Sequence, residues 1–176
     1  EMLFLFAFSV GQHSATALVH LTFLVALAAA IVAYGKRFDQ PAAGWLAALV
    51  VFTAPVVGRD ASVAYNDVAL ACVIFLVFFA LEIWDRDRSM AWLAVAGLLA
   101  GFCYAIKYTG GIAILFAAAF VFWRSRSWKA VAIVVGVAFL SVAPWALKNW
   151  LWLDNPVSPF FNRLFPNPYV HVSTEE

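Results

Sequence analysis

The polar residues that could do chemistry in this chain stand at the ends of long apolar runs. The candidates that share this position are Arg59, Asp60, Asn66, Asp67, Lys107, Tyr108, Lys148 and Asn149. A carboxylate such as Asp67 can take a proton from an attacking hydroxyl group, and a lysine can hold a phosphate group as a point charge. Ionisable residues near a membrane are often functional. The set therefore predicts a functional site near the membrane boundary, where Lys107 could hold a lipid phosphate group.

Each of the main candidates also has a purely structural explanation. Asp67 opens an apolar run, where a helix dipole favours an acid by about 0.3–1 kcal/mol. Asn66 could equally cap that helix through its side chain. Lys107 and Lys148 could extend their ammonium groups from a helix end toward water, and we expect Asp60 to be solvated.

Three further reactive residues lie inside apolar runs, and we expect structural roles for them. His20 is expected to be a hydrogen-bonded interior residue rather than a ligand. Cys72 and Cys103 are expected to be free thiols that pack as small apolar groups. No metal-binding spacing is present, although a divalent metal cofactor stays possible.

The composition places the chain in a membrane. Hydrophobic residues make up 65% of it and charged residues only 12%, whereas soluble domains are close to half apolar and a quarter charged. The mean hydropathy is +0.90. The net charge of +1 gives no reason to expect a nucleic-acid partner.

The apolar runs predict an all-α, polytopic transmembrane bundle of about six spans. A span needs about 20 apolar residues, and runs without alternation favour helices over barrel strands. We expect the bundle to occupy residues 1–152, with Gly97 and Gly101 allowing close helix approach, and a proline- and aromatic-rich outer loop over 153–176. The expected spans are 14–34, 42–57, 68–84, 90–106, 112–123 and 129–145.

The basic residues predict the orientation of these spans. Seven of the eleven lie in loops on one side: Lys36, Arg37, Arg86, Arg88, Arg124, Arg126 and Lys129. The positive-inside rule makes that side cytoplasmic, so the candidate site residues face outward. Residue 1 then also lies outside, and no signal peptide precedes it. We therefore expect a fragment of a longer protein, with an upstream span.

Three groups of motifs carry a resemblance to a known family. Each group lies where apolar runs end or begin on the outer side. The motifs are Thr53-Ala54-Pro55 before Tyr65-Asn66-Asp67, Ala96-Gly97-Leu98-Leu99-Ala100-Gly101 leading into Ile106-Lys107-Tyr108-Thr109-Gly110, and Pro144-Trp145 with Lys148-Asn149 before Asp154-Asn155-Pro156-Val157-Ser158-Pro159-Phe160. Their order over roughly residues 12–165 resembles the GT-C superfamily, and within it the family 39 or protein-mannosyltransferase-like enzymes of bacteria.

The resemblance implies a membrane glycosyltransferase of the bacterial inner membrane. Such enzymes transfer a sugar from a polyprenyl-phosphate carrier to a lipid, glycan or protein acceptor on the periplasmic face. It implies that Asp67 is a secondary acid, and that the family's main catalytic acid lies in an outer loop upstream of this fragment. The other implied roles are donor-phosphate binding for Lys107, Tyr108 and Lys148, and a place in the substrate cavity for Arg59, Asp60, Asn66 and Asn149.

Two other functions stay open. A transporter is disfavoured because transporters often carry broken helices and polar groups near mid-span, whereas these span centres are almost purely apolar. The other is a non-enzymatic membrane subunit that contacts membrane lipids. Such a subunit gives no reason for a concentration of polar residues on one face of the membrane. That concentration favours the enzyme.

Overall fold

The protein is all-α over the residues that the computed structural model describes, which are 2–63, 65–166 and 169. The helices are α1 (Met2–Arg37), α2 (Pro41–Thr53), α3 (Pro55–Ala61), α4 (Asp67–Asp87), α5 (Met90–Ile106), the short 3₁₀ helix η1 (Tyr108–Gly111), α6 (Ile112–Ser125) and α7 (Trp128–Leu153). The prediction of an all-α bundle is confirmed.

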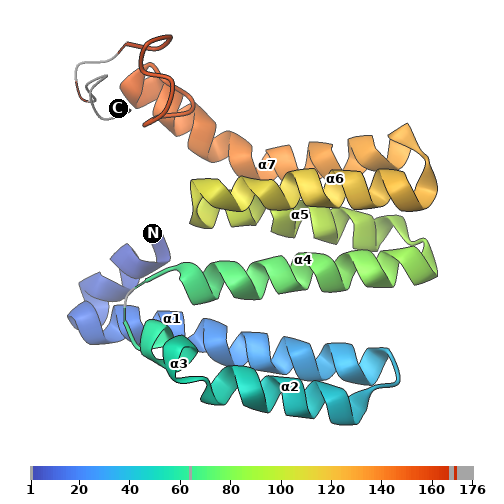
Figure 1. The fold of residues 1–176 in the computed structure, drawn as a ribbon. Helices are drawn as coiled ribbons and strands as arrows, with labels where there is room; N and C mark the ends of the chain where they lie inside the picture. Colours follow the sequence, from blue (N-terminus) through green and yellow to red (C-terminus); the bar gives the residue numbers. More distant parts are fainter. Residues whose placement is uncertain (1, 64, 167–168, 170–176) are drawn as a thin grey trace.

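The long helices run between two ends of an elongated bundle (Figure 1). We call one the basic end, because it contains the loops α1–α2, α4–α5 and α6–α7 with most of the basic residues. The other is the α3 end, formed by α3, the start of α4, the end of α5 with η1, and the last turns of α7. Because successive long helices are antiparallel, polar run ends that are far apart in sequence gather at the α3 end.

The core lies between α4, α5, α6 and α7, around fully buried residues such as Leu81, Leu93 and Val121. Close packing of α5 on α7 depends on two glycines. A Cβ atom at Gly101 would overlap the carbonyl oxygen of Ala138, and one at Gly97 would lie 2.5 Å from the carbonyl oxygen of Val134. The predicted role of this glycine pair is confirmed.

Three interruptions shape the α3 end. α1 breaks at Gly11 and Gln12, where Gln12 has φ 56°, so its first turns form a separate short piece. α2 and α3 meet at an angle of 65°, where Pro55 opens α3 at a position whose N–H needs no helical partner. α7 contains Pro144, which removes one backbone hydrogen bond, and its ribbon bends along its length (Figure 1).

The prediction of six membrane spans is wrong. Four segments of the described chain are long and apolar enough to cross a membrane, and the bent α2–α3 pair makes a fifth if it counts as one span. α5 has 17 residues and extends for about 25 Å, which is less than the apolar thickness of about 30 Å. The four segments are Leu3–Arg37, Asp67–Asp87, Tyr108–Ser125 and Trp128–Leu153. They indicate a multi-pass integral membrane protein.

The C-terminal part of the chain follows α7. Turns occupy residues 154–166 after the helix ends at Leu153. Of the predicted outer loop, residues 167, 168 and 170–176 lie outside the described residues.

Candidate functional site

The α3 end brings Asp67 and Lys107 into direct contact. Asp67 is the first residue of α4, and Lys107 follows the last residue of α5 in extended backbone with φ −153°. Lys107 Nζ donates to Asp67 Oδ1 at 2.7 Å. Their side chains stay 43% and 57% exposed, so the ion pair faces open space. Two candidates that lie forty positions apart in sequence thus form one unit.

Asn66 ties the same two helix ends together. It occupies the N-cap position of α4 but forms no side-chain cap hydrogen bond, which contradicts the structural alternative of a side-chain cap. Its side-chain amide instead donates to the carbonyl oxygen of Ile106 at 3.2 Å. Asn66 therefore holds the start of α4 beside Lys107.

Tyr108 links η1, α7 and the turns that follow α7. Its hydroxyl group accepts a hydrogen bond from Trp145 Nε1 at 3.3 Å and donates to the carbonyl oxygen of Ser158. Asn149, which is 2% exposed, donates to the same carbonyl at 3.4 Å. The edge of the Tyr108 ring also meets Phe160, with centroids 5.3 Å apart. Tyr108 is thus a fixed part of the site wall.

Two buried asparagines order the turns that present Ser158. The amide nitrogen of Asn155 donates to the carbonyl oxygen of Phe160 at 2.8 Å and to Asn162 Oδ1 at 3.2 Å. The backbone N–H of Val157 donates to Asn155 Oδ1 at 3.0 Å. Buried polar groups that are satisfied in this way fix a local conformation, and here they fix the Ser158 carbonyl against Tyr108.

A cavity of about 350 Å³ opens beside these groups. Helices α1, α4, α5 and α7 and the short helix η1 all contribute to its wall. Its polar lining is Asn66, Tyr104, Lys107, Tyr108 and Trp145, and its apolar lining is Leu3, Phe4, Phe23, Ala69, Phe102, Ala105 and Ile106. The first piece of α1, before the break, supplies Leu3 and Phe4. The cavity therefore combines one cation and several hydrogen-bonding groups with a wide apolar surface.

Five predicted site residues lie outside this lining. Asp67 and Asn149 are linked to lining residues through the bonds described above, and the other three are Arg59, Asp60 and Lys148. Arg59 is exposed on α3. The Lys148 ammonium lies 3.7 Å from the ring centroid of Trp145 and 5.7 Å from that of Trp152. Asp60 is not simply solvated as expected, because its Oδ2 atom is buried and has no hydrogen-bond partner in the described part of the chain.

His20 has the structural role that the sequence predicts. It is fully buried, and its Nδ1 lies 3.1 Å from the carbonyl oxygen of Asp60 and 2.9 Å from that of Val63. Its Nε2 accepts from the backbone N–H of Ala69 at 3.4 Å. These partners require a neutral ring with the proton on Nδ1. His20 thereby joins α1 to the segment between α3 and α4.

Metal binding has little support in this arrangement. Within the described ranges, no group of three or more His, Cys, Asp or Glu side chains is placed to hold a metal ion. Cys72 and Cys103 are free and buried. The positive charge in the cavity lining comes from Lys107.

Some residues of the site escaped prediction from the sequence. A tryptophan near a helix end is typical of the membrane interface, so the sequence offers no reason to expect that Trp145 donates a hydrogen bond to Tyr108. Tyr104 lies four residues before Tyr108, a spacing that indicates a shared side of the helix end. Ser158 contributes only its carbonyl oxygen, and no side-chain pattern predicts a backbone acceptor.

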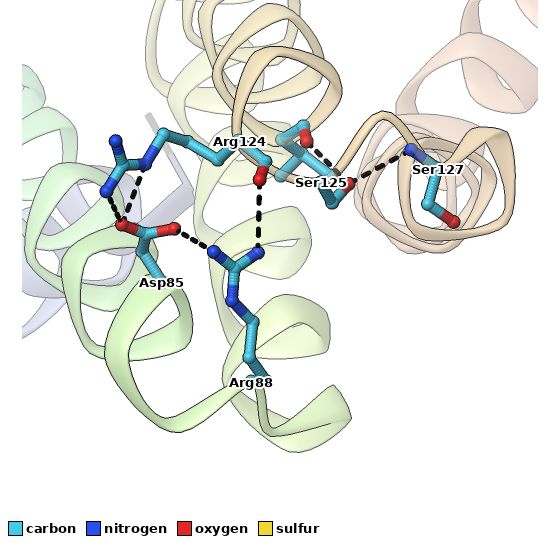
Figure 2. A network of polar contacts seen from close by, with 6 residues as sticks. Asp85, Arg88, Arg124, Ser125 and Ser127 are labelled. Atoms are coloured by element: carbon cyan, nitrogen blue, oxygen red, sulfur yellow. Dashed lines mark hydrogen bonds and ion pairs between the residues drawn. The ribbon is translucent and has the colours of Figure 1, made fainter.

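The basic end contains a denser cluster of charges (Figure 2). Arg88 Nη2 donates to Asp85 Oδ1 at 2.7 Å, and Arg124 Nε donates to Asp85 Oδ2 at 2.8 Å. Arg88 also donates to the carbonyl oxygen of Arg124 at 3.4 Å. The Asp85 side chain is only 10% exposed. This cluster joins α4 to α6, which adds a packing role to the topological one expected from the sequence.

Comparison with known proteins shows the family to which the chain belongs. The family model described as a domain of unknown function (DUF8201) matches residues 3–169. No curated protein and no solved structure matches the chain. The family description names no activity, so any function must be argued from the site itself.

Proposed function

We propose that this chain, which belongs to the family of the domain of unknown function DUF8201, is part of a membrane glycosyltransferase. The proposed reaction moves a sugar from a polyprenyl-phosphate donor to a lipid, glycan or protein acceptor. It takes place on the periplasmic face of the bacterial inner membrane. The observation that carries the proposal is the cavity at the α3 end, which joins a lysine to an apolar wall.

The lining of the cavity suits an amphipathic donor. A polyprenyl phosphate has a charged head and a long hydrocarbon chain, and its head must stay at the membrane boundary. Lys107 and Tyr108 offer polar groups to the head, while Phe4, Phe23 and Phe102 offer apolar surface to the first part of the chain. The volume of about 350 Å³ lies within the usual range of small-molecule sites, about 300–1,000 Å³.

Lys107 is the residue that would stabilise the leaving group. During transfer, the acceptor oxygen bonds to the anomeric carbon and the bond from that carbon to the phosphate oxygen breaks. The phosphate leaves with the electron pair and gains negative charge, which a fixed cation stabilises. A lysine ammonium has three donors, of which Asp67 takes one. Lys107 can therefore bind a phosphate oxygen without leaving Asp67.

Asp67 is placed to act on the acceptor side of the same reaction. The acceptor hydroxyl group must lose its proton, and a carboxylate within hydrogen-bonding distance can receive it or orient the hydroxyl group. Asp67 is exposed and lies beside Lys107, so an acceptor can reach it. We assign it the role of a secondary, positioning acid. Asn66 and Asn149 hold the surrounding helix ends in place.

Binding of a polyprenyl phosphate tests the proposal. We expect the purified protein to retain the phosphate in native mass spectrometry more strongly than a polyprenol of the same chain length. Lys107→Gln should weaken phosphate retention about tenfold or more, because hydrogen bonds to charged groups contribute about 1.5–3 kcal/mol. It should leave polyprenol retention unchanged.

The matched control removes a lysine from the basic end. Lys129 is exposed near the start of α7, and Lys129→Gln should leave retention of both lipids as in the parent. Equal retention of the phosphate by Lys107→Gln and the parent would contradict the proposal. Equal retention of phosphate and alcohol by the parent would favour a membrane subunit without this activity.

A further inference from the structure

A second apolar groove lies between α1 and α2, and its lining shares no residue with the cavity at the α3 end. Its volume is about 570 Å³. The lining includes small residues at the helix seam, among them buried Ala48, and larger exposed side chains, among them Trp45 and Leu49. Four alanines, Ala28, Ala29, Ala33 and Ala48, lie among these larger apolar side chains. An open apolar groove of this kind can take a hydrocarbon chain.

The length of the groove matches one leaflet of a bilayer. Its lining on α1 runs from Val25 to Lys36, which corresponds to about 16 Å along a helix. That is close to half of the apolar thickness of about 30 Å. Lys36 lies at the basic end, which the positive-inside rule places in the cytoplasm. A lipid in this groove would therefore come from the cytoplasmic leaflet.

The positive charge of Lys36 at the end of the groove favours an anionic headgroup. Lys36 is exposed, and its ammonium lies 5.7 Å from the ring centroid of Trp45. Its neighbour Arg37 is bound to Asp87 at 3.0 Å, whereas Lys36 forms no ion pair within the described residues. A lysine over the Trp45 ring occupies the place that a choline group would prefer. The site thus offers a cation to a phosphate group and repels a second cation.

We propose that the α1–α2 groove binds an anionic phospholipid of the cytoplasmic leaflet. One acyl chain lies along the alanines of the lining, and the headgroup phosphate contacts Lys36. Basic pockets between transmembrane helices on the cytoplasmic side bind acidic headgroups in this way. The proposal is independent of the glycosyltransferase assignment, because the groove and the cavity use different residues.

Native mass spectrometry of the purified protein with defined lipids tests the groove. Phosphatidylglycerol and phosphatidylcholine with identical acyl chains are the probes. We expect the parent to retain phosphatidylglycerol about fivefold more strongly, since a basic residue at a membrane surface contributes about 1 kcal/mol toward an anionic lipid. Lys36→Gln should remove this preference. Ala33→Phe, which fills the groove at an exposed position, should weaken retention of both lipids.

Three outcomes would overturn the proposal. One is an unchanged preference in Lys36→Gln. Another is an equal loss in Lys129→Gln, which removes the same charge elsewhere at the basic end and would reveal unspecific attraction. The third is a parent dimer that Ala33→Phe converts to a monomer, because the groove would then hold a second copy of the chain. Lys36→Gln decides the matter even if Ala33→Phe does not fold.

Discussion

The two ends of the bundle use charged residues in different ways. At the basic end, both oxygens of Asp85 are bound by arginines, and the side chain is 10% exposed. At the α3 end, Asp67 receives one bond from Lys107, and both side chains are about half exposed. The first carboxylate is bound at both oxygens and nearly buried, whereas the second pair keeps bonding capacity that faces outward.

The difference between the two carboxylates indicates different roles: helix packing for the Asp85 cluster and the proposed ligand binding for the Asp67–Lys107 pair. Arginine presents a rigid fork of donors that suits a lasting carboxylate pair, while lysine is a mobile point charge that can change partners. The arginine cluster joins α4 to α6 and binds both oxygens of Asp85 (Figure 2). The single lysine lines a cavity. Charge density alone would select the basic end as the donor site, whereas unused donors select the α3 end, where we propose that the donor binds.

The largest effect on stability is expected at Asp85. Asp85→Asn removes the negative charge and leaves two arginines facing each other at the end of α4. We expect the free energy of unfolding to fall by about 2 kcal/mol, because hydrogen bonds to charged groups contribute about 1.5–3 kcal/mol. Unfolding in mixed micelles, followed by circular dichroism, measures the change.

A neighbouring carboxylate provides the matched control for Asp85. Asp87 pairs with Arg37, but its side chain is 41% exposed, and exposed ion pairs contribute about 0–1 kcal/mol. Asp87→Asn should therefore cost less than half as much as Asp85→Asn. Equal losses would mean that the bonds from two arginines to Asp85 stabilise the fold no more than the single exposed ion pair of Asp87. The contrast between the two ends would then fail. Retention of polyprenyl phosphate should be unchanged in both variants.

A smaller effect is expected from Tyr108→Phe, which tests how much the hydrogen bonds of Tyr108 stabilise the wall of the site. The change leaves Trp145 Nε1 and one bond of the Ser158 carbonyl unmatched, and should cost about 1 kcal/mol of unfolding free energy. Tyr104→Phe is the control from the same cavity. If both variants lose the same stability, the hydrogen bonds of Tyr108 do not explain the order of the wall.

Much of the helical architecture could be predicted from the sequence, because lipid leaves the backbone few alternatives. Apolar runs located the helices, and Gly97 and Gly101 predicted a close helix contact, which the structure places between α5 and α7. The span count failed because hydropathy does not reveal a bend such as that at Pro55. Hydropathy also does not show whether a helix of 17 residues, such as α5, crosses the membrane.

The candidate site was predictable in part, for a physical reason. Antiparallel helices bring alternate run ends together, so Asp67 and Lys107 could be assigned to one face from topology alone. Asn66 illustrates the limit, because its choice of the Ile106 carbonyl over a cap depends on the local helix geometry. The polar network around Ser158 depends on a folded turn, and such contacts between distant segments carry no periodic signal.

The smallest effect is expected at Lys148, and it sharpens the comparison within the α3 end itself. Lys148 and Lys107 are both basic residues near helix ends, but only Lys107 lines the cavity. The Lys148 ammonium lies over the Trp145 ring at 3.7 Å, a contact that contributes about 0.5–1 kcal/mol at exposed sites. Because Lys148 does not line the cavity, Lys148→Gln should change polyprenyl-phosphate retention less than about twofold, which corresponds to about 0.4 kcal/mol. A loss as large as that of Lys107→Gln would place both lysines on the phosphate and extend the site across α7.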